Sequence, residues 1–87
     1  MLKTETENFG GAVTLRLTGR IIGPWVNELR QICEPLAKDG SKLALNLVEV
    51  SYADEDGAML LASLRKRGVR LLNPTPFIAA QLKSVPS

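Results

Sequence analysis

Residues 43–57 read LALNLVEVSYADEDG, an apolar run that leads into three consecutive carboxylates and a glycine. The run over residues 43–48 is nearly continuous, which is typical of a central strand that is covered on both sides of a sheet. Beyond the acids, apolar residues return at helical spacing and predict a helix that runs to about Arg67. That stripe consists of Gly57, Leu60, Leu61 and Leu64. The segment therefore predicts a buried strand and then a helix, with the acidic residues at their junction.

Upstream of this segment, the sequence predicts a β-hairpin and a helix. Residues 2–9 are a weak strand candidate, and Gly10-Gly11 suits a two-residue turn whose central positions both need positive φ. Apolar and polar residues then alternate over residues 13–18, as in a half-buried strand. Helical spacing follows from Pro24, which suits a first helical turn, and Pro35 predicts that this helix ends or kinks close to it.

Downstream, the pattern predicts one more strand and one more helix. Gly68 suits the C-terminal cap of the second helix, residues 69–72 form a buried strand, and Pro76 opens a short helix to about Lys83. Two strand–helix–strand units favour parallel pairing with right-handed crossovers, after an antiparallel hairpin. The predicted fold class is α/β: an N-terminal β-hairpin continuing into a βαβαβα series, with helices packed on a mixed sheet of about four strands.

Length and hydropathy limit the domain count and the location. At 87 residues the chain is long enough for one core and too short for two, so we expect a single domain over residues 1–87. Its core is expected over residues 12–82 and a C-terminal tail over residues 83–87. No apolar run approaches the roughly 20 residues that span a bilayer, and the first residues are polar. These features predict a cytoplasmic protein without direct membrane insertion.

Charge and residue types argue against several function classes. The net charge of +2 is small and the aromatic residues are scattered, so nucleic-acid binding is not expected. Histidine is absent, which removes Ser-His and Cys-His nucleophilic pairs and leaves carboxylates as the ligands for a metal. Cys33, the single cysteine, lies on the apolar face of the first predicted helix and is interpreted as a core residue. The prediction is a protein that is not an enzyme and holds no cofactor.

The consecutive acids Asp54, Glu55 and Asp56 allow a catalytic and a structural interpretation. As magnesium ligands or a phosphoacceptor site, they would lie where open α/β sheets bind ligands, at the carboxyl end of a strand. Adjacent helix residues, however, point about 100° apart, and no second carboxylate cluster accompanies them. As a helix start, Asp54 is the cap, and the helix dipole stabilises each of the next two acids by roughly 0.3–1 kcal/mol. The helix start is favoured, and no metal site is expected.

Two further residues, Met59 and Ala62, lie off the apolar stripe and close to the acidic helix start. Their position allows incidental surface exposure or a patch that docks a partner, and the sequence leaves both interpretations open.

These residues together resemble the signature of the STAS domain family, the sulphate-transporter and anti-sigma-factor-antagonist family. In that family an apolar strand leads to an aromatic position, then Asp-Ser-Ser-Gly, then a helix. Residues 45–57, LNLVEVSYADEDG, show the same order. Residues 15–21 and 68–74 look like the family's strand–glycine–helix segment and its next strand. The resemblance covers residues 12–82 and implies a STAS-like fold, in agreement with the topology predicted above.

In the family, the second serine of Asp-Ser-Ser-Gly is phosphorylated by a partner kinase that doubles as an anti-sigma factor, and the phosphate ends the association. The resemblance aligns Asp54 with the family aspartate, Glu55 with the first serine, Asp56 with the phosphoacceptor and Gly57 with the glycine. Asp56 therefore has a permanent carboxylate at the switch position. Ile22 is a second departure, because the family usually has aspartate there.

The resemblance implies a bacterial protein–protein interaction module in signal transduction and transcription regulation, like anti-sigma factor antagonists but with a phosphomimetic, non-phosphorylatable switch residue. The expected partner is an anti-sigma factor or a kinase-like protein. One alternative is a STAS-like accessory subunit that binds the ATPase of an ABC-type lipid transport system, and another is a metal-dependent phosphate-handling protein. A homodimer is compatible with the resemblance. The expected partner-binding residues are Asp54, Glu55, Asp56, Gly57, Ala58, Met59 and Ala62.

Overall fold

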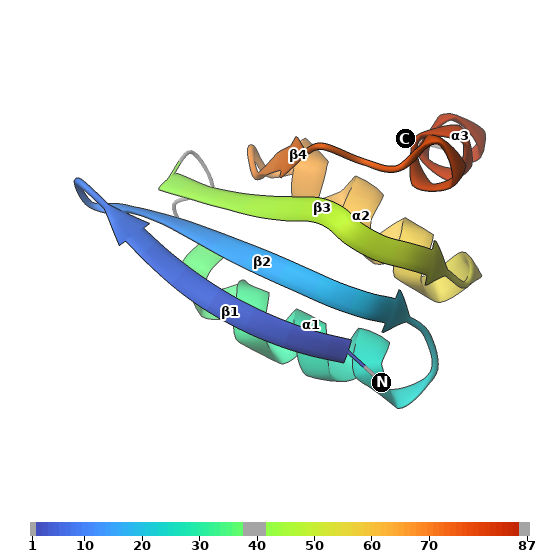
Figure 1. Ribbon diagram of the computed structural model, residues 1–87, viewed down its shortest axis with the longest axis horizontal. Helices are drawn as coiled ribbons and strands as arrows, with labels where there is room; N and C mark the ends of the chain where they lie inside the picture. The colour runs from blue at the N-terminus through green and yellow to red at the C-terminus, as the bar shows by residue number, and fades with distance from the viewer. Residues whose placement is uncertain (1, 38–41, 86–87) are drawn as a thin grey trace.

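A mixed sheet with helices on one of its faces forms the body of the protein (Figure 1). The computed structural model describes residues 2–37 and 42–85. In chain order the elements are β1 (Leu2–Phe9), β2 (Ala12–Ile21), α1 (Pro24–Leu36), β3 (Leu43–Ala53), α2 (Glu55–Lys66), β4 (Arg70–Leu72) and α3 (Pro76–Ser84). The strand order is β1-β2-β3-β4; β1 pairs antiparallel with β2, and the other two pairs are parallel. This is the α/β topology that the sequence predicted.

The N-terminal hairpin follows from its two glycines. Gly10 and Gly11 have φ of 55° and 85°, the positive values that a two-residue hairpin turn requires. β1 then pairs with β2 over its whole length, and Glu5 lies opposite Arg16 as predicted. The weak strand candidate is thus a full strand of eight residues.

The two faces of the sheet have different environments. Figure 1 shows α1 and α2 behind the strands, while the face toward the viewer is free of helices. In β2, Leu15, Leu17 and Ile21 are buried against the helices, whereas Arg16 and Arg20 are exposed on the open face. The largest fully buried side chains are Leu15, Leu17, Ile21, Leu29, Leu43, Leu45, Leu47, Val50, Leu61, Leu64, Val69 and Ile78. The core therefore draws on the sheet and all three helices.

β3 differs from the prediction in its length and its covering. It continues to Ala53, well beyond the apolar run, and Val48 is 49% exposed instead of covered on both sides. Its register against β2 shifts between Arg16 and Thr18 and again between Gly19 and Arg20. Each shift inserts an extra residue into β3, which is a β-bulge and changes the local side-chain alternation. The apolar run indicated a buried strand but not these bulges.

The helix ends agree closely with the sequence signals. α1 continues only to Leu36, one residue past Pro35. α2 ends at a glycine cap in which Gly68 has φ 96° and the N–H of Val69 donates to the carbonyl of Leu64 at 3.1 Å. α3 ends at Ser84, one residue past the predicted end at about Lys83, and buried Leu82 lies in its last turn. Residues 86–87 lie outside the described residues.

No helix among residues 2–37 and 42–85 is long and apolar enough to cross a membrane.

Candidate functional site at the start of α2

The candidate site lies at the C-terminal end of β3, where the chain turns into α2. Asp54 is the N-cap of α2, as predicted, and its Oδ1 accepts a hydrogen bond from the N–H of Gly57 at 2.8 Å. Its Oδ2 accepts another from the N–H of Gly23 at 3.0 Å, in the loop between β2 and α1. Its own N–H donates to the carbonyl of Ile21 at 3.2 Å. One side chain therefore caps the helix and joins two loops, and neither carboxylate oxygen is left free.

Gly57 is required by the close approach of α2 to the end of β2. A Cβ atom on this residue would lie 2.3 Å from the carbonyl oxygen of Ile21 and 3.3 Å from the Cβ of Ala53. Only a residue without a side chain fits there without displacing the backbone of β2. Gly57 is accordingly buried and is part of the packing, so it offers no side chain to a partner.

Glu55 and Asp56 occupy the first turn of α2 and are exposed, as the helix-start interpretation predicted. Neither makes a hydrogen bond or an ion pair within the described residues. Negative charge at this end of a helix is stabilised by the dipole. Among those residues, no group of three or more acidic, histidine or cysteine side chains could hold a metal ion.

The structure corrects the expected accessibility of Ala58 and Ala62. Both were expected among the partner-binding residues, but they are only 3% and 5% exposed. Ala58 lines a groove together with residues of α3, which packs on α2, and Ala62 belongs to the main hydrophobic core. Met59, in contrast, is 51% exposed. The accessible part of the expected set is thus Glu55, Asp56 and Met59, here called the α2 surface.

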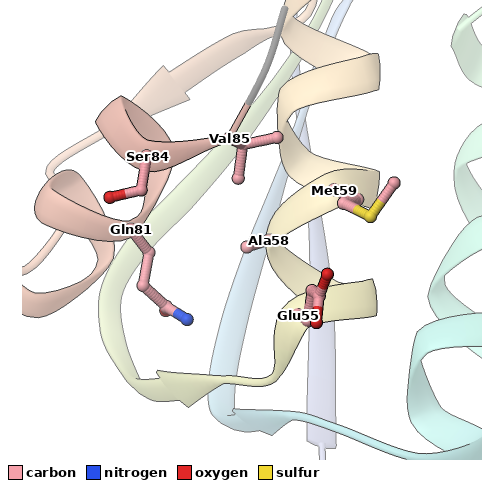
Figure 2. Close-up of a pocket in the computed structure, with 6 residues that line it drawn as sticks. All are labelled: Glu55, Ala58, Met59, Gln81, Ser84 and Val85. Atoms are coloured by element: carbon pink, nitrogen blue, oxygen red, sulfur yellow. The ribbon is translucent and has the colours of Figure 1, made fainter.

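A groove between α2 and α3 adjoins this surface (Figure 2). Its volume is about 340 Å³, and its lining consists of Glu55, Ala58, Met59, Gln81, Ser84 and Val85. Glu55 contributes to the groove, whereas Asp56 does not. The three lining residues from the C-terminal segment were not predicted, because nothing in the sequence indicated that α3 would lie against α2.

The side chain of Gln81 hydrogen-bonds α3 to the end of β3. Its Nε2 donates to the carbonyl of Ala53 at 2.7 Å, one residue before the cap of α2. Its buried Oε1 has no hydrogen-bond partner among the described residues. At the start of α3, the Thr75 hydroxyl accepts from the N–H of Ile78 at 3.3 Å and donates to the carbonyl of Val50 at 3.4 Å. α3 is therefore held against β3 at both of its ends.

An exposed aromatic pair lies near the start of α3. Tyr52 of β3 and Phe77 of α3 stack with ring centroids 5.2 Å apart and an interplanar angle of 24°. They remain 43% and 45% exposed. The sequence interpretation described the aromatic residues as scattered, which is wrong for these two. They are 25 positions apart in the sequence, and only the packing of α3 on β3 brings them together.

Cys33 is fully buried in α1, as predicted. Burial raises the pKa of its thiol from 9.0 to about 11, and the nearby carboxylate of Glu34 adds to the shift. At neutral pH this residue is a small apolar core side chain and not a nucleophile.

Comparison with known proteins gives structural likeness without sequence likeness. No protein-family model matches the sequence, and no curated protein matches it. Among solved structures, the anti-sigma factor antagonist SpoIIAA in its unphosphorylated form superposes with a TM-score of 0.73 and 20% identity. That match covers 97% of this chain and 84% of SpoIIAA.

Two further solved structures are similar. An anti-sigma factor antagonist from Mycobacterium paratuberculosis has a TM-score of 0.70 and 16% identity, over 98% of this chain and 94% of that one. The protein Mglu has a TM-score of 0.60 and 27% identity, over 78% of this chain but only 18% of Mglu. The chain therefore has the fold of anti-sigma factor antagonists, and the STAS-like architecture predicted from the sequence is confirmed.

Proposed function

We propose that this chain is a non-enzymatic protein-binding module of the anti-sigma-factor-antagonist kind, whose partner docks on the α2 surface. The observation that supports this most is the likeness to two such antagonists over 97% and 98% of the chain. The resemblance places the family's contact and switch segment at residues 54–57, and here those residues form the start of α2. The exposed acids and Met59 lie at that position.

Within this segment, the structure separates residues that build the site from residues that can contact a partner. Asp54 and Gly57 are occupied by the cap and by the contact with Ile21. Glu55, Asp56 and Met59 are exposed, and neither acid makes a hydrogen bond or ion pair within the described residues. The groove beside them offers an apolar floor at Ala58. A partner that presents a basic group beside an apolar side chain would be complementary to this surface.

We also propose that phosphorylation at the switch position does not regulate this module. Asp56 has no hydroxyl group to modify, and its single charge is about half of the −1.5 to −2 that a phosphate adds. A fixed carboxylate at the first turn of α2 holds the site permanently in a state that resembles the modified one. Kinase-type anti-sigma factors that release a phosphorylated partner should therefore bind this chain poorly.

Affinity capture from a native lysate tests the docking surface. The wild-type chain is compared with the double variant Glu55→Lys/Asp56→Lys, in which both exposed acids are reversed. Glu28→Lys, an exposed acid of α1, is the matched control. We expect the specific partner to be lost in the double variant and kept in the control. Retention of every captured partner by the double variant would contradict the assignment of this surface.

The identity of the captured protein separates the two partner classes. An anti-sigma factor or kinase-like protein agrees with the first interpretation, and the ATPase of a lipid transport system agrees with the second. Whichever protein is captured, incubation of the chain with added anti-sigma kinases and ATP should leave residues 51–63 without phosphate. Stoichiometric phosphate on that segment would contradict the proposal that the switch is fixed. Asp56→Ser, which restores a hydroxyl group, is the positive control for modification.

A further inference from the structure

β1 is a long and regular edge strand. It lies at one end of the strand order, so no strand of the described part of the chain pairs with its outer side, and Figure 1 shows α1 passing behind it. Its eight residues pair with β2 without a register shift, whereas β4 at the other edge has three residues. Exposed edges are usually short, bulged, covered or charged, because their unpaired N–H and C=O groups recruit another strand. β1 is not short, bulged or covered, but it carries the charged side chains Lys3, Glu5 and Glu7.

The geometry of the hairpin determines which backbone groups of β1 are free. In a hairpin closed by a two-residue turn, the residues that flank the turn form a hydrogen-bonded pair, here Phe9 and Ala12. Hydrogen-bonded and non-hydrogen-bonded pairs then alternate along the strands. The odd-numbered residues of β1 therefore bond to β2. The N–H and C=O groups of Thr4 and Thr6 point away from the sheet and are available to a second strand.

The side chains of β1 on the open face form an ordered charge pattern. Lys3 and Glu5 are neighbours on that face, with Nζ and Oε1 4.0 Å apart and side chains 69% and 57% exposed. Glu7 follows on the same face. A pattern that runs from positive to negative along a strand is complementary to itself when two such strands lie antiparallel. Charges of one sign along the whole strand would repel a second copy instead.

We propose that two copies of this chain pair antiparallel through β1, with Thr4 opposite Thr4 of the second copy at the two-fold axis. In this register Lys3 lies opposite Glu5 of the second copy, and the reverse pair is formed by symmetry. Both are non-hydrogen-bonded pairs, in which opposing side chains are closest. Thr4 supplies the central pair of backbone hydrogen bonds. The two sheets become one continuous sheet, with α1 and α2 of both copies on the same side.

The neighbouring register of the β1–β1 pair is disfavoured by charge repulsion. Side chains alternate between the two faces of a strand, so odd-numbered residues lie on one face and even-numbered residues on the other. To keep the helices of both copies on one side, odd-numbered residues must lie opposite odd-numbered ones, and even-numbered opposite even-numbered. A shift to the next such register would put Glu5 opposite Glu5 of the second copy in a close pair. Directly opposed like charges destabilise a strand pair. The charges of β1 therefore select the register centred on Thr4.

The inferred dimer leaves the α2 surface accessible. α2 and α3 lie on the β3 and β4 side of the sheet, away from the outer side of β1 (Figure 1). Each dimer would present two α2 surfaces, and a dimeric partner would then bind with a gain from effective concentration. The dimer itself does not depend on the proposed function.

Charge exchange tests the pairing without knowledge of any partner. Lys3→Glu places acids opposite each other in a self-pair, and Glu5→Lys places bases opposite each other. By sedimentation velocity, each variant alone should dimerise with a Kd raised about tenfold or more over the wild type. An equimolar mixture should form a mixed dimer, because every opposed pair is then of opposite charge. Glu28→Lys, an exposed acid of α1 outside the paired strands, is the control and should dimerise like the wild type.

Hydrogen exchange gives a residue-resolved measurement of the same proposal. The amides of Thr4 and Thr6 should exchange more slowly as the protein concentration rises, because only the dimer protects them. The amide of Asn8 also points outward but lies beyond the paired residues, so its exchange should not depend on concentration. Thermal unfolding of each variant verifies that it is folded. A monomer at all concentrations, or a mixture that fails to restore the dimer, would overturn the proposal.

Discussion

At the scale of single residues, the start of α2 depends on two side chains with different roles. Asp54 was predicted as the helix cap, and the structure confirms it, but the cap also bonds to Gly23 in another loop. Gly57 was expected to match a family glycine. The structure gives the physical reason, which is the carbonyl of Ile21 at 2.3 Å from the place of a Cβ. Local sequence rules predict caps, whereas close approaches between elements depend on how the elements pack.

Replacement of Gly57 by alanine should destabilise the protein, although alanine is the better helix former by about 0.8–1.0 kcal/mol. The overpacking against Ile21 should exceed that gain and lower the free energy of unfolding by about 1–3 kcal/mol. Urea denaturation measures the change. Ser63→Ala, on the exposed side of the same helix, is the control and should stay within about 0.5 kcal/mol of wild type. A Gly57→Ala variant as stable as the wild type would show that β2 can move away.

Cys33 should make stability depend on pH in the alkaline range. Burial raises the pKa of the thiol from 9.0 to about 11, so the unfolded chain loses this proton at lower pH than the folded chain. The folded state then binds more protons, and the free energy of unfolding should fall between pH 9 and pH 11. Urea denaturation across this range should show a shallower decline for Cys33→Ala, in which the other titrating groups are unchanged. If the free energy of unfolding declined equally with pH in both proteins, the raised pKa of Cys33 would be contradicted.

At the scale of elements, β3 and α3 define the site and show where sequence patterns lose information. In β3 the side chains do not simply alternate between the two faces of the sheet, because two register shifts against β2 change their directions. The pattern of α3 gave its existence and its start at Pro76, but not its position. That position forms the groove over Ala58 and brings Tyr52 onto Phe77.

The stacked rings should couple β3 to α3 in a measurable way. In a double-mutant cycle of Tyr52→Ala and Phe77→Ala, we expect a coupling energy of about 0.5–1.5 kcal/mol, because stacked aromatic pairs contribute that much beyond the area they bury. Urea denaturation of the two single variants and the double variant gives this value. A second cycle of Tyr52→Ala with Met59→Ala, whose side chain is not stacked on Tyr52, should give no coupling. Additive effects in the first cycle would show that the rings do not stabilise each other.

At the scale of the whole molecule, the protein is a one-sided sheet with a single apolar layer between strands and helices. The buried leucines of β2, β3, α1 and α2 meet in that layer. The open face carries charged and polar side chains, including the ion pair of Arg16 with Glu49. Because all elements share one core, they should unfold together.

Leu61→Ala should therefore weaken the entire fold. Leu61 is fully buried in α2, and such a truncation leaves a cavity that lowers the free energy of unfolding by about 2–5 kcal/mol. Urea unfolding followed by far-UV circular dichroism and by the fluorescence of Trp25 in α1 should give the same reduced midpoint. Met59→Ala, two positions away and half exposed, should have a much smaller effect. Different midpoints for the two probes would mean that α1 unfolds separately.

The sequence by itself determined the order and type of the elements, the turn at Gly10 and Gly11 and the cap at Asp54. Each depends on the conformational or hydrogen-bonding preferences of residues that are neighbours in the chain. Only the tertiary structure decided the length of β3, the burial of Ala58 and the groove beside Met59. These depend on contacts between residues far apart in the sequence, and one pattern of apolar positions is compatible with several such packings. The acidic stretch is thus a helix start by sequence, and the packing of α3 decides which residues beside it are exposed.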